Sequence, residues 1–550
     1  MRRPGSRRAL AKLPDASAIA PDVVRPASRE ETFPLAMAAM VVAFVSLLVS
    51  YSRGYLLLYG DAVAHMGIAR RIVDSRNPGL NQLGGVWLPL PHILMLPFIS
   101  RMEWWQNGLA GAWPSLLCYI LGVAGFYRLA RRMLTPRWSF AATVFFALNP
   151  NLLYLSTTAM TEPLFLAILI WATLLTMEFT AAVREGQSTV AARRLLLLGV
   201  LTLAAVYTRY DGWILGAAIW GTVTWQVFAR RQRLWSKVAP WYVIFTVLAV
   251  AGPLGWLAYN QHLFHDPLDF LRGPYSAAAI DRRWSPGHAG WHNPLWAAVL
   301  YTRAAQLVAS AWETGFAVMA AAIGGLALAC RCNTERAALL LWIPLPFYVY
   351  SISFGSVPIY IPPLWPHSYY NARYGVEMLP ALAVSAFFLL QWLARRWNER
   401  HRLAAQLLYP AALSLGALNA VAMMAATPIV LKEAKANSIT RVAFEAALSR
   451  YLQSFPPGAT IMMYTDHIGA IQQAGIPLRQ FIGGRENDSW QQALTAPADH
   501  AAFVVAMEGD PVSKAVAEHP EGLTELAVLC TTGQSCARIY QSNRFITLTH

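Results

Sequence analysis

The sequence predicts an all-α polytopic membrane protein with about eleven transmembrane helices, followed by a small soluble α/β domain at its C-terminal end. Of the 550 residues, 56% are hydrophobic and only 13% are charged. Ordinary soluble domains carry about 25% charged residues, so this chain lacks the polar surface that a water-soluble protein needs. The apolar residues gather in runs of about 20, which is the length of a helix that crosses a bilayer.

The expected spans are separated by polar connections. They are residues 33–51, 112–132, 138–155, 163–180, 194–207, 212–228, 241–259, 314–330, 337–353, 375–393 and 404–426. A shorter apolar stretch at 86–99 precedes the second span. The segment 294–310 is also apolar enough to be a span, and counting it would invert the topology of everything after it.

The basic residues predict the orientation. Loops 131–137, 184–194, 230–237, 331–336 and 395–402 all carry Arg or Lys and fall on one side, as expected of loops retained in the cytoplasm. Residues 1–32, rich in Arg, Pro and Ala, are then a disordered cytoplasmic tail. This scheme gives a transmembrane domain at 33–428 with outer loops at 52–111, 260–296 and 354–374, and an extracytoplasmic domain at 429–550. The Arg- and Ala-rich composition favours a bacterial inner membrane.

The formal net charge of +15 does not indicate nucleic-acid binding. The Lys and Arg residues cluster in short stretches between apolar runs, such as 128–132 and 230–233. Nucleic-acid-binding proteins instead carry a continuous basic face together with a recognition motif, and this sequence has neither.

After residue 426 the hydrophobicity falls and the pattern changes. Strands are expected at 459–464, 501–507 and 526–530, and helices at 467–474, 489–494 and 511–518. Alternating strands and helices predict a small α/β domain. Cys530 and Cys536 flank a short polar loop between two strand-like runs, so a hairpin disulfide is expected if the domain faces an oxidising compartment. No cysteine spacing indicates a zinc site.

The first outer loop contains Asp61 and His65, one turn apart if this segment is helical. Asp61 directly follows Gly60, just beyond the first span. A carboxylate at this boundary can act as a general base on a hydroxyl, oriented by His65 or by a backbone group. The alternative is that Asp61 only caps the helix, since Asp is a preferred N-cap residue. The segment alone does not decide between the two.

Glu162 precedes Pro163 at the outer end of a span. A glutamate at a helix start complements the helix dipole and needs no catalytic role, and this structural interpretation is favoured for the residue alone. Carboxylates inside membrane segments are nevertheless costly and often functional, so Glu162 is kept as a catalytic candidate.

Several arginines lie on the side where positive charge is not needed for orientation, among them Arg209, Arg272 and Arg373. Any one of them could extend its side chain to phospholipid headgroups. As a set, however, they predict an outward-facing cavity for an anionic group at the membrane surface, such as a lipid phosphate.

At these residues the chain resembles the GT-C superfamily of integral-membrane glycosyltransferases, in the style of the bacterial protein O-mannosyltransferase and lipid A aminoarabinose transferase branch. The patches that carry the resemblance are Gly60-Asp61 with His65 and Ala69, Trp87 to Pro91, Asn149-Pro150 through Glu162-Pro163, Tyr259 to Leu268, and Arg373-Tyr374 to Pro380. The resemblance covers about residues 33 to 393. Each patch alone is only moderately specific. The resemblance depends on the order of the patches along the chain and on their placement relative to the spans.

The resemblance implies a transferase that uses a polyprenyl-phosphate-linked sugar on the outer face and attacks the anomeric carbon with inversion. Asp61 matches the family's first-loop acidic residue and would be the base or would orient the acceptor. Arg373 would stabilise the phosphate leaving group, with Arg209 and Arg272 as further phosphate-binding candidates.

The chain departs from the family pattern at Ala62, where many relatives carry a second acidic residue. The second carboxylate then comes from elsewhere, with Glu162 and Asp266 as candidates, or the chemistry differs. Tyr374 is a further candidate for contact with the acceptor. Some members of the superfamily use a divalent metal held by such carboxylates, so Ala62 puts a metal cofactor in doubt.

Two other function classes remain open at this point. A transporter or flippase of a lipid-linked or anionic substrate would place ionisable residues in the middle of spans and tend to contain inverted repeats. A non-catalytic envelope assembly factor would keep the topology without requiring Asp61. Replacement of Asp61 by Asn discriminates between an enzyme and such a factor.

Overall fold

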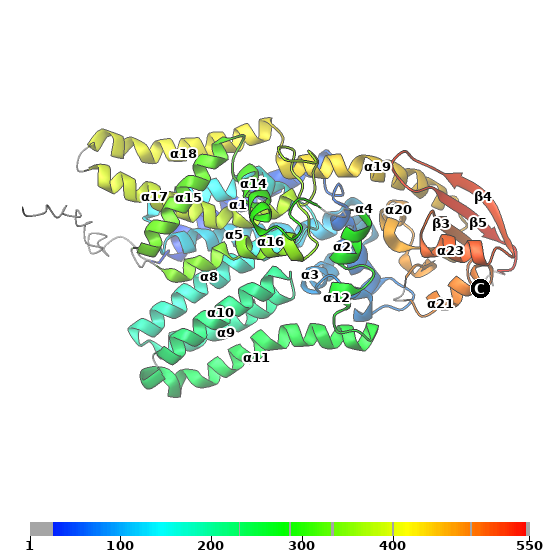
Figure 1. Cartoon of the computed structure of the whole chain (residues 1–550), viewed down its shortest axis with the longest axis horizontal. Coiled ribbons are helices and arrows are strands. Elements are labelled where there is room, and N and C mark those ends of the chain that lie inside the picture. Colours follow the sequence, from blue (N-terminus) through cyan, green and yellow to red (C-terminus); the bar gives the residue numbers. More distant parts are fainter. Residues whose placement is uncertain are drawn as a thin grey trace, which may run out of the picture.

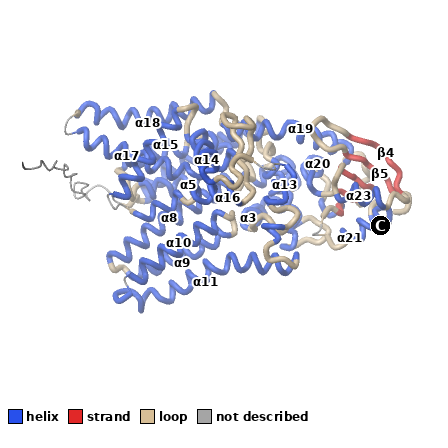
Figure 2. Tube along the Cα trace, in the orientation of Figure 1, coloured by secondary structure: helices blue, strands red, loops and turns tan. Residues whose placement is uncertain are grey.

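The computed structural model describes residues 26–229, 231–284, 288–331, 335–398, 401–484 and 487–545. Long helices form a bundle at one end of the molecule, and the strands lie at the other end (Figures 1 and 2). Within the described residues, nine helical segments are long and apolar enough to cross a membrane. They are α1 (Arg29–Ser52), α5 (Leu109–Ala130), α8 (Glu162–Glu185), α9 (Ser188–Val206), α11 (Arg231–Phe264), α15 (Thr314–Arg331), η4 with α16 (Arg336–Trp342 and Pro344–Phe354), η5 with α17 (Ala372–Met378 and Leu379–Asn398), and α18 (Arg402–Ala425) with its continuation.

The two other expected spans correspond to α10 (Asp211–Ala229) and to a broken helix. The predicted span 138–155 is divided into α6 (Pro136–Ala147) and α7 (Pro150–Leu155). The Asn149 side chain caps α7 by accepting hydrogen bonds from two backbone N–H groups, and the ring nitrogen of Pro150 cannot donate to continue α6. A continuous span at 138–155 is therefore wrong.

The N-terminal tail is shorter than expected. Residues 1–25 lie outside the described residues, but α1 already begins at Arg29, so residues 29–32 are helical. The Ser28 side chain accepts a hydrogen bond from the Glu31 N–H, and acidic residues in the first turn favour a helix start.

Lipid-facing surfaces are visible as exposed apolar side chains on the outside of the bundle. Leu48, Val247 and Leu418 are about half exposed or more, on α1, α11 and α18 respectively. The ambiguous segment 294–310 forms α14 (Pro294–Ala309), whose 16 residues are shorter than the roughly 20 needed to span a bilayer. It packs instead against η5, and a Cβ on Gly375 would lie 2.7 Å from the Ala304 backbone.

Short helices lie between the bundle and the C-terminal domain (Figure 1). They are α2 (Gly60–Val73), η3 (Leu80–Leu83), α3 (Leu90–Ile99), α4 (Met102–Asn107), α12 (Asp269–Arg272) and α13 (Ala277–Trp284). The α19 helix (Ile429–Leu452) follows α18 and leads into the C-terminal domain.

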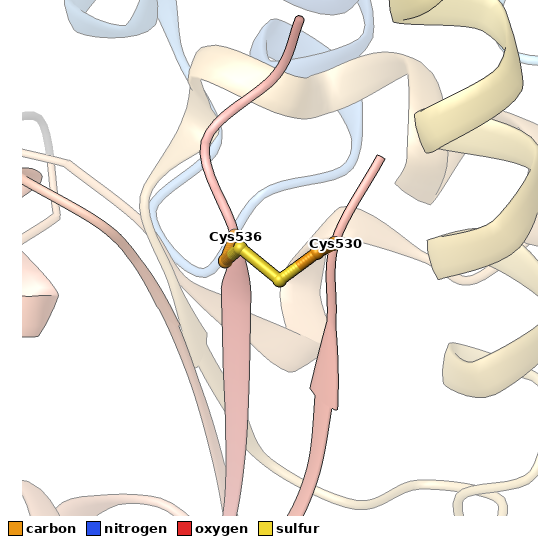
Figure 3. Close-up of a disulfide and its surroundings, with 2 residues drawn as sticks. All are labelled: Cys530 and Cys536. Atoms are coloured by element: carbon orange, nitrogen blue, oxygen red, sulfur yellow. A yellow bond between two sulfur atoms is a disulfide. The ribbon is translucent and has the colours of Figure 1, made fainter. Parts of the chain in front are cut away.

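The C-terminal domain contains a mixed five-stranded sheet in the order β2-β1-β3-β5-β4. Its elements are β1 (Ile461–Met463), η6 (Thr465–His467), α20 (Ile468–Ala474), η7 (Leu478–Gln480), β2 (Phe481–Ile482), α21 (Trp490–Thr495), α22 (Pro497–His500), β3 (Phe503–Met507), α23 (Pro511–Glu518), β4 (Leu523–Leu529) and β5 (Ala537–Ser542). Strands β2, β1 and β3 are parallel, and β5 is antiparallel to both β3 and β4. The structure joins Cys530 and Cys536 by a disulfide across the β4–β5 turn (Figure 3). Strand β2 was not expected from the sequence, whereas β5 is the strand-like run expected after Cys536.

Candidate active site

The centre of the candidate site is the buried guanidinium of Arg373 on the tight turn η5. Each of its three nitrogens donates to a different carboxylate: Nη2 to Asp61 Oδ2 at 2.5 Å, Nε to Glu162 Oε1 at 3.2 Å, and Nη1 to Glu433 Oε1 at 3.1 Å. These carboxylates come from α2, α8 and α19, so Arg373 joins segments far apart in the sequence. The sequence-predicted pair of Asp61 and Arg373 is in direct contact.

A second guanidinium, that of Arg209, lies between α9 and α10. Its Nη1 donates to the Thr161 hydroxyl at 2.7 Å, and its Nε donates to Asp211 Oδ2 at 3.2 Å. Its Nη2 is 2.6 Å from the Tyr348 hydroxyl and 3.2 Å from Glu377 Oε1. Tyr348 donates to the same oxygen of Glu377 at 2.8 Å, which closes a small network around the guanidinium.

Glu162 links the two arginines. Its Oε1 lies 3.2 Å from Arg373 Nε and 3.5 Å from Arg209 Nη1, and its side chain is fully buried. It occupies the first turn of α8, directly before Pro163, as the helix-dipole interpretation expects. Its ion pairs with two arginines go beyond that interpretation. Its second oxygen, Oε2, is buried without a hydrogen-bond partner in the part of the chain that the structure describes.

Asp61 is the accessible carboxylate of the cluster. Its side chain is 43% exposed, whereas those of Glu162 and Glu433 are at most 1% exposed. It does not cap α2, because the N-cap position is Tyr59 and no side-chain capping hydrogen bond forms there. Its position in the first turn and its pairing with Arg373 favour the functional interpretation.

Aromatic rings fill the space between the two guanidiniums. The Tyr374 ring centre lies 4.8 Å from the Arg373 Cζ and 5.1 Å from the Arg209 Cζ. The Tyr59 ring lies 5.1 Å from the Arg373 Cζ, and Tyr348 stacks on Tyr374 at 5.0 Å. Cations over aromatic faces are stabilised by the ring quadrupole, so these rings hold the arginines in place.

His65 lies beside the cluster, but its side-chain contacts are with His92 and Trp87. Its Nδ1 is 2.9 Å from His92 Nε2, and its ring stacks on Trp87 with centroids 4.3 Å apart. Burial, assisted by the positive charges of Arg209 and Arg373, lowers the pKa of His65 to about 3. The imidazole is therefore neutral at neutral pH, and its polar contact is with His92.

Asp266 and Arg272 form a separate ion pair. Two hydrogen bonds of 2.7 Å join them, and the Arg272 side chain is 64% exposed. The hydrogen bonds from Arg272 hold the pKa of Asp266 below its usual range. Neither residue has a contact with Arg373 or Arg209 among the interactions of the described residues.

The sequence interpretation missed four members of the cluster: Asp211, Glu377, Glu433 and Tyr348. Asp211 is only two residues from Arg209, and Glu377 is four residues from Arg373. Carboxylates inside or beside apolar segments are costly and mark functional or paired positions, so that signal could have found Asp211 and Glu377, whereas no local pattern places Glu433 at the cluster. Tyr348 carries no comparable signal in the sequence.

The charges of the cluster do not balance. Five carboxylates (Asp61, Glu162, Asp211, Glu377 and Glu433) surround the two guanidiniums. Buried charges need compensation, so this excess attracts protons or cations. The described residues contain no group of three or more His, Cys, Asp or Glu side chains arranged to hold a metal ion.

A small pocket opens beside the cluster, between α3, α5 and the start of α8. Apolar side chains make most of its wall, including Leu94, Met95, Pro114 and Met160. Thr161, which accepts the hydrogen bond from Arg209, also lines it. The pocket thus joins an apolar surface to the charged cluster.

Several known proteins are similar to this chain. The family model described as dolichyl-phosphate-mannose-protein mannosyltransferase matches residues 104–256. The crystal structure of ArnT from Cupriavidus metallidurans bound to undecaprenyl phosphate is similar over 94% of this chain and 98% of that chain, with a TM-score of 0.56 and 16% sequence identity. The archaeal oligosaccharyltransferase AglB from Archaeoglobus fulgidus, in complex with an inhibitory peptide and a dolichol-phosphate, covers 94% of this chain and 75% of its own, with a TM-score of 0.45 and 11% identity.

No curated protein matches the sequence itself. At 16% identity, the likeness to ArnT establishes the fold alone. With the family-model match, it confirms both the resemblance seen in the sequence motifs and the multi-pass all-α membrane architecture.

Proposed function

The chain has the fold of the GT-C superfamily, and we propose that it is a glycosyltransferase that moves a sugar from a polyprenyl-phosphate donor to a hydroxyl of a lipid, glycan or protein. The proposal places the reaction at the extracytoplasmic face of a bacterial inner membrane. The observation that carries it is the contact between Asp61 and Arg373, in which a half-exposed carboxylate is held by a buried guanidinium.

In the proposed reaction, the acceptor oxygen forms a bond to the anomeric carbon while the bond from that carbon to the phosphate oxygen breaks. The electron pair of the broken bond leaves with the phosphate, and the configuration inverts. The acceptor proton passes to Asp61, which acts as the general base. The exposure of Asp61 supports this role, because a base must reach the substrate.

The Arg373 contact couples proton transfer to departure of the phosphate. In the structure, Nη2 of Arg373 is engaged by Asp61 Oδ2. Once Asp61 takes the acceptor proton, it loses its charge and its strong hold on Nη2. That N–H group then becomes available to the phosphate as negative charge develops on it. Glu162 and Glu433 keep the guanidinium in place during the exchange, because their bonds to Nε and Nη1 remain.

Arg209 has a less direct part in the proposal. Its guanidinium is saturated by buried partners, so it adds positive potential and fixes Glu162. The exposed Arg272 lies outside the cluster and would act on the approach of the donor phosphate. Asp266 would serve as a second carboxylate only after releasing Arg272, and His65 would support the orientation of α2 through its contact with His92.

The apolar pocket supports a lipid-linked donor. A polyprenyl phosphate joins a charged group to a long hydrocarbon chain, and the pocket beside Thr161 offers apolar wall next to charged residues. Apolar surfaces with a few polar groups at one end are typical of such ligand sites.

The test uses purified full-length protein in lipid nanodiscs with a panel of polyprenyl-phosphate sugars and candidate acceptors. We expect wild type to form a new glycosidic bond, detected by mass spectrometry, and Asp61→Asn to lose about 10²- to 10⁴-fold of the rate, as expected for removal of a general base. Glu313→Gln is the matched control, since Glu313 is an exposed carboxylate paired with another arginine, Arg303.

The competing functions give different results in the same test. A transporter or flippase would relocate the labelled donor across the bilayer without forming a glycosidic bond. An assembly factor would show no dependence on Asp61 in a cellular complementation assay. Equal product formation by wild type and Asp61→Asn would overturn the assignment of the base.

A further inference from the structure

The α19 helix reaches from the C-terminal domain into the charged cluster. Its first turn is fixed to the membrane part of the chain by two hydrogen bonds at Val430. The Val430 N–H donates to Asn151 Oδ1 at 3.0 Å, and its carbonyl accepts from the Tyr59 hydroxyl at 2.9 Å. The start of α19 is therefore held against α7 and against the residue before α2.

Glu433, one turn further along α19, holds both the side chain and the backbone at η5. Its Oε1 accepts from Arg373 Nη1 at 3.1 Å and from the Asn371 N–H at 3.0 Å. Asn371 has a φ of +56°, and its side chain donates to the Pro358 carbonyl at 3.0 Å. One carboxylate oxygen thus fixes the guanidinium together with the strained turn that delivers it.

Burial of the Glu433 carboxylate costs free energy, and its ion pair alone does not explain why it is buried. Its side chain is 1% exposed, and its Oε2 has no hydrogen-bond partner among the described residues. A buried ion pair is weak evidence for stability, because desolvation offsets much of the attraction. Accurate placement of a guanidinium within a reaction site is a better account of this carboxylate.

Arg441 fixes the backbone of the segment that leads to Asp61. Its Nη2 donates to the carbonyls of Leu57 and Leu58, both at 2.9 Å, and its Nη1 pairs with Glu445 at 2.7 Å. Leu58 is three residues before Asp61. Glu433 and Arg441 are eight residues apart, about two helical turns, so they lie on the same side of α19.

The C-terminal domain contacts both α19 and α2. Gln534 donates to the Thr440 hydroxyl on α19 at 2.8 Å. Gln534 lies in the loop closed by the Cys530–Cys536 disulfide, which Figure 3 shows. Ile468 at the start of α20 packs so closely on α2 that a Cβ on Gly67 would lie 2.7 Å from its Cδ1. The domain therefore touches both elements that position the reacting groups.

We propose that α19 is a positioning element of the site, through which the C-terminal domain sets the geometry of Arg373 and Asp61. Glu433 and Arg441 are positioning residues, since neither touches the reacting atoms in the proposed mechanism. The kinetic part of this inference rests on the proposed glycosyltransferase function, whereas its structural part does not.

The test compares Glu433→Gln, Glu433→Asp and Arg441→Gln with wild type, using full-length protein in nanodiscs. The matched controls are Glu518→Gln on α23 and Arg450→Gln near the end of α19, both at exposed positions. The first measurement is amide hydrogen exchange of the peptides that cover residues 57–63 and 371–378. We expect faster exchange at 371–378 in Glu433→Gln, faster exchange at 57–63 in Arg441→Gln, and wild-type exchange in both controls.

The second measurement is transfer kinetics. Misplacement of a catalytic group by about 1 Å can cost on the order of 100-fold in rate, so we expect kcat to fall about 10- to 100-fold in Glu433→Gln with KM for the donor changed less than about twofold. Glu433→Asp keeps the charge and should recover part of kcat. If Glu433 only supported folding, Glu433→Gln would lower the yield of active protein. It would not lower kcat at nearly constant KM, and Glu433→Asp would not restore kcat.

The outcomes separate the two proposals. Faster exchange at 371–378 in Glu433→Gln supports the inference even if no polyprenyl-phosphate sugar is a donor, in which case the proposed function alone fails. Wild-type exchange at 371–378 in Glu433→Gln overturns the inference, whatever the transfer assay gives. Transfer by wild type and Glu433→Gln at equal kcat also overturns it.

Discussion

The two buried arginines make almost the same set of contacts but differ in the exposure of their partners. Arg373 and Arg209 each face three carboxylates and share Glu162. One carboxylate at Arg373, that of Asp61, is 43% exposed, whereas every carboxylate at Arg209 is at most 1% exposed. A ligand can exchange with an exposed partner but not with a fully enclosed one. Under the proposed mechanism, this difference assigns Arg373 to the reaction and Arg209 to the framework around it.

The largest expected effect is that of Arg373→Lys on transfer. A lysine keeps the charge but lacks the planar set of donors that meets three carboxylates and a phosphate. We expect kcat to fall by about 10²- to 10³-fold, the range seen when one donor to a developing charge is removed. Steady-state transfer measures this loss, and gel filtration checks the folded yield. Retention of more than about a tenth of the wild-type rate would contradict the exchange of Asp61 for phosphate at Nη2.

Arg209→Gln should instead act mainly on stability. It leaves the buried carboxylates of Asp211 and Glu377 without their cation, and breaking a buried pair in this way costs about 3–5 kcal/mol. Thermal unfolding in detergent measures the loss. Arg303→Gln is the control, because its partner Glu313 is 67% exposed and water can replace the missing cation. An unchanged midpoint for Arg209→Gln combined with lost transfer would reverse the roles assigned to the two arginines.

Much of the fold could be predicted from the sequence, because hydrophobic runs and basic loops specify membrane helices strongly. The positions of α8 and α17 follow directly from such runs. The break at Asn149-Pro150 was missed because an apolar run continues across it, while capping and the missing N–H of proline act locally. Strand β2 was missed because it contains only Phe481 and Ile482, which is too short for a periodic pattern.

The site was harder to predict than the fold. Asp61, Glu162, Arg209 and Arg373 were identified because they follow or precede apolar runs at the same end of the bundle. Glu433 was assigned to the soluble domain, since no local pattern tells that α19 returns to the cluster. Contacts between residues 60 apart or more depend on how the helices pack, and a single sequence does not contain that information in readable form.

The pH dependence of folding stability reports on the buried environment of His65. Its pKa is lowered from 6.5 to about 3 by burial and by both guanidiniums. Between these values the unfolded chain binds a proton that the folded chain does not, so folding stability rises with pH and is complete above about pH 6.5. We expect stability to fall as the pH drops from 6.5 towards 3, by up to about 1.4 kcal/mol per pH unit from this group.

The variant His65→Gln tests that expectation. Glutamine can still exchange a hydrogen bond with His92 but does not titrate, so its stability should depend less on pH over this window than that of wild type. His401→Gln at an exposed position is the control and should keep the wild-type pH dependence. Identical slopes for wild type and His65→Gln in unfolding experiments at pH 4 to 6.5 would mean that His65 is not held neutral by the buried cluster.

The smallest effect is expected at Arg272, which makes the sharpest contrast with Arg373. Its guanidinium is 64% exposed and pairs with Asp266, so its charge acts on the donor from a distance through water. Charges at the rim of a site change the rate of encounter and its salt dependence more than the chemical step. Arg272→Gln should therefore raise KM for the donor about two- to threefold at low salt and leave kcat unchanged. Because the Debye length shrinks from about 30 Å at 0.01 M to about 8 Å at 0.15 M ionic strength, the effect should fade as salt is added. A loss of kcat that persists at high salt would instead mean that Arg272 touches the phosphate, and the phosphate would then lie outside the cluster centred on Arg373.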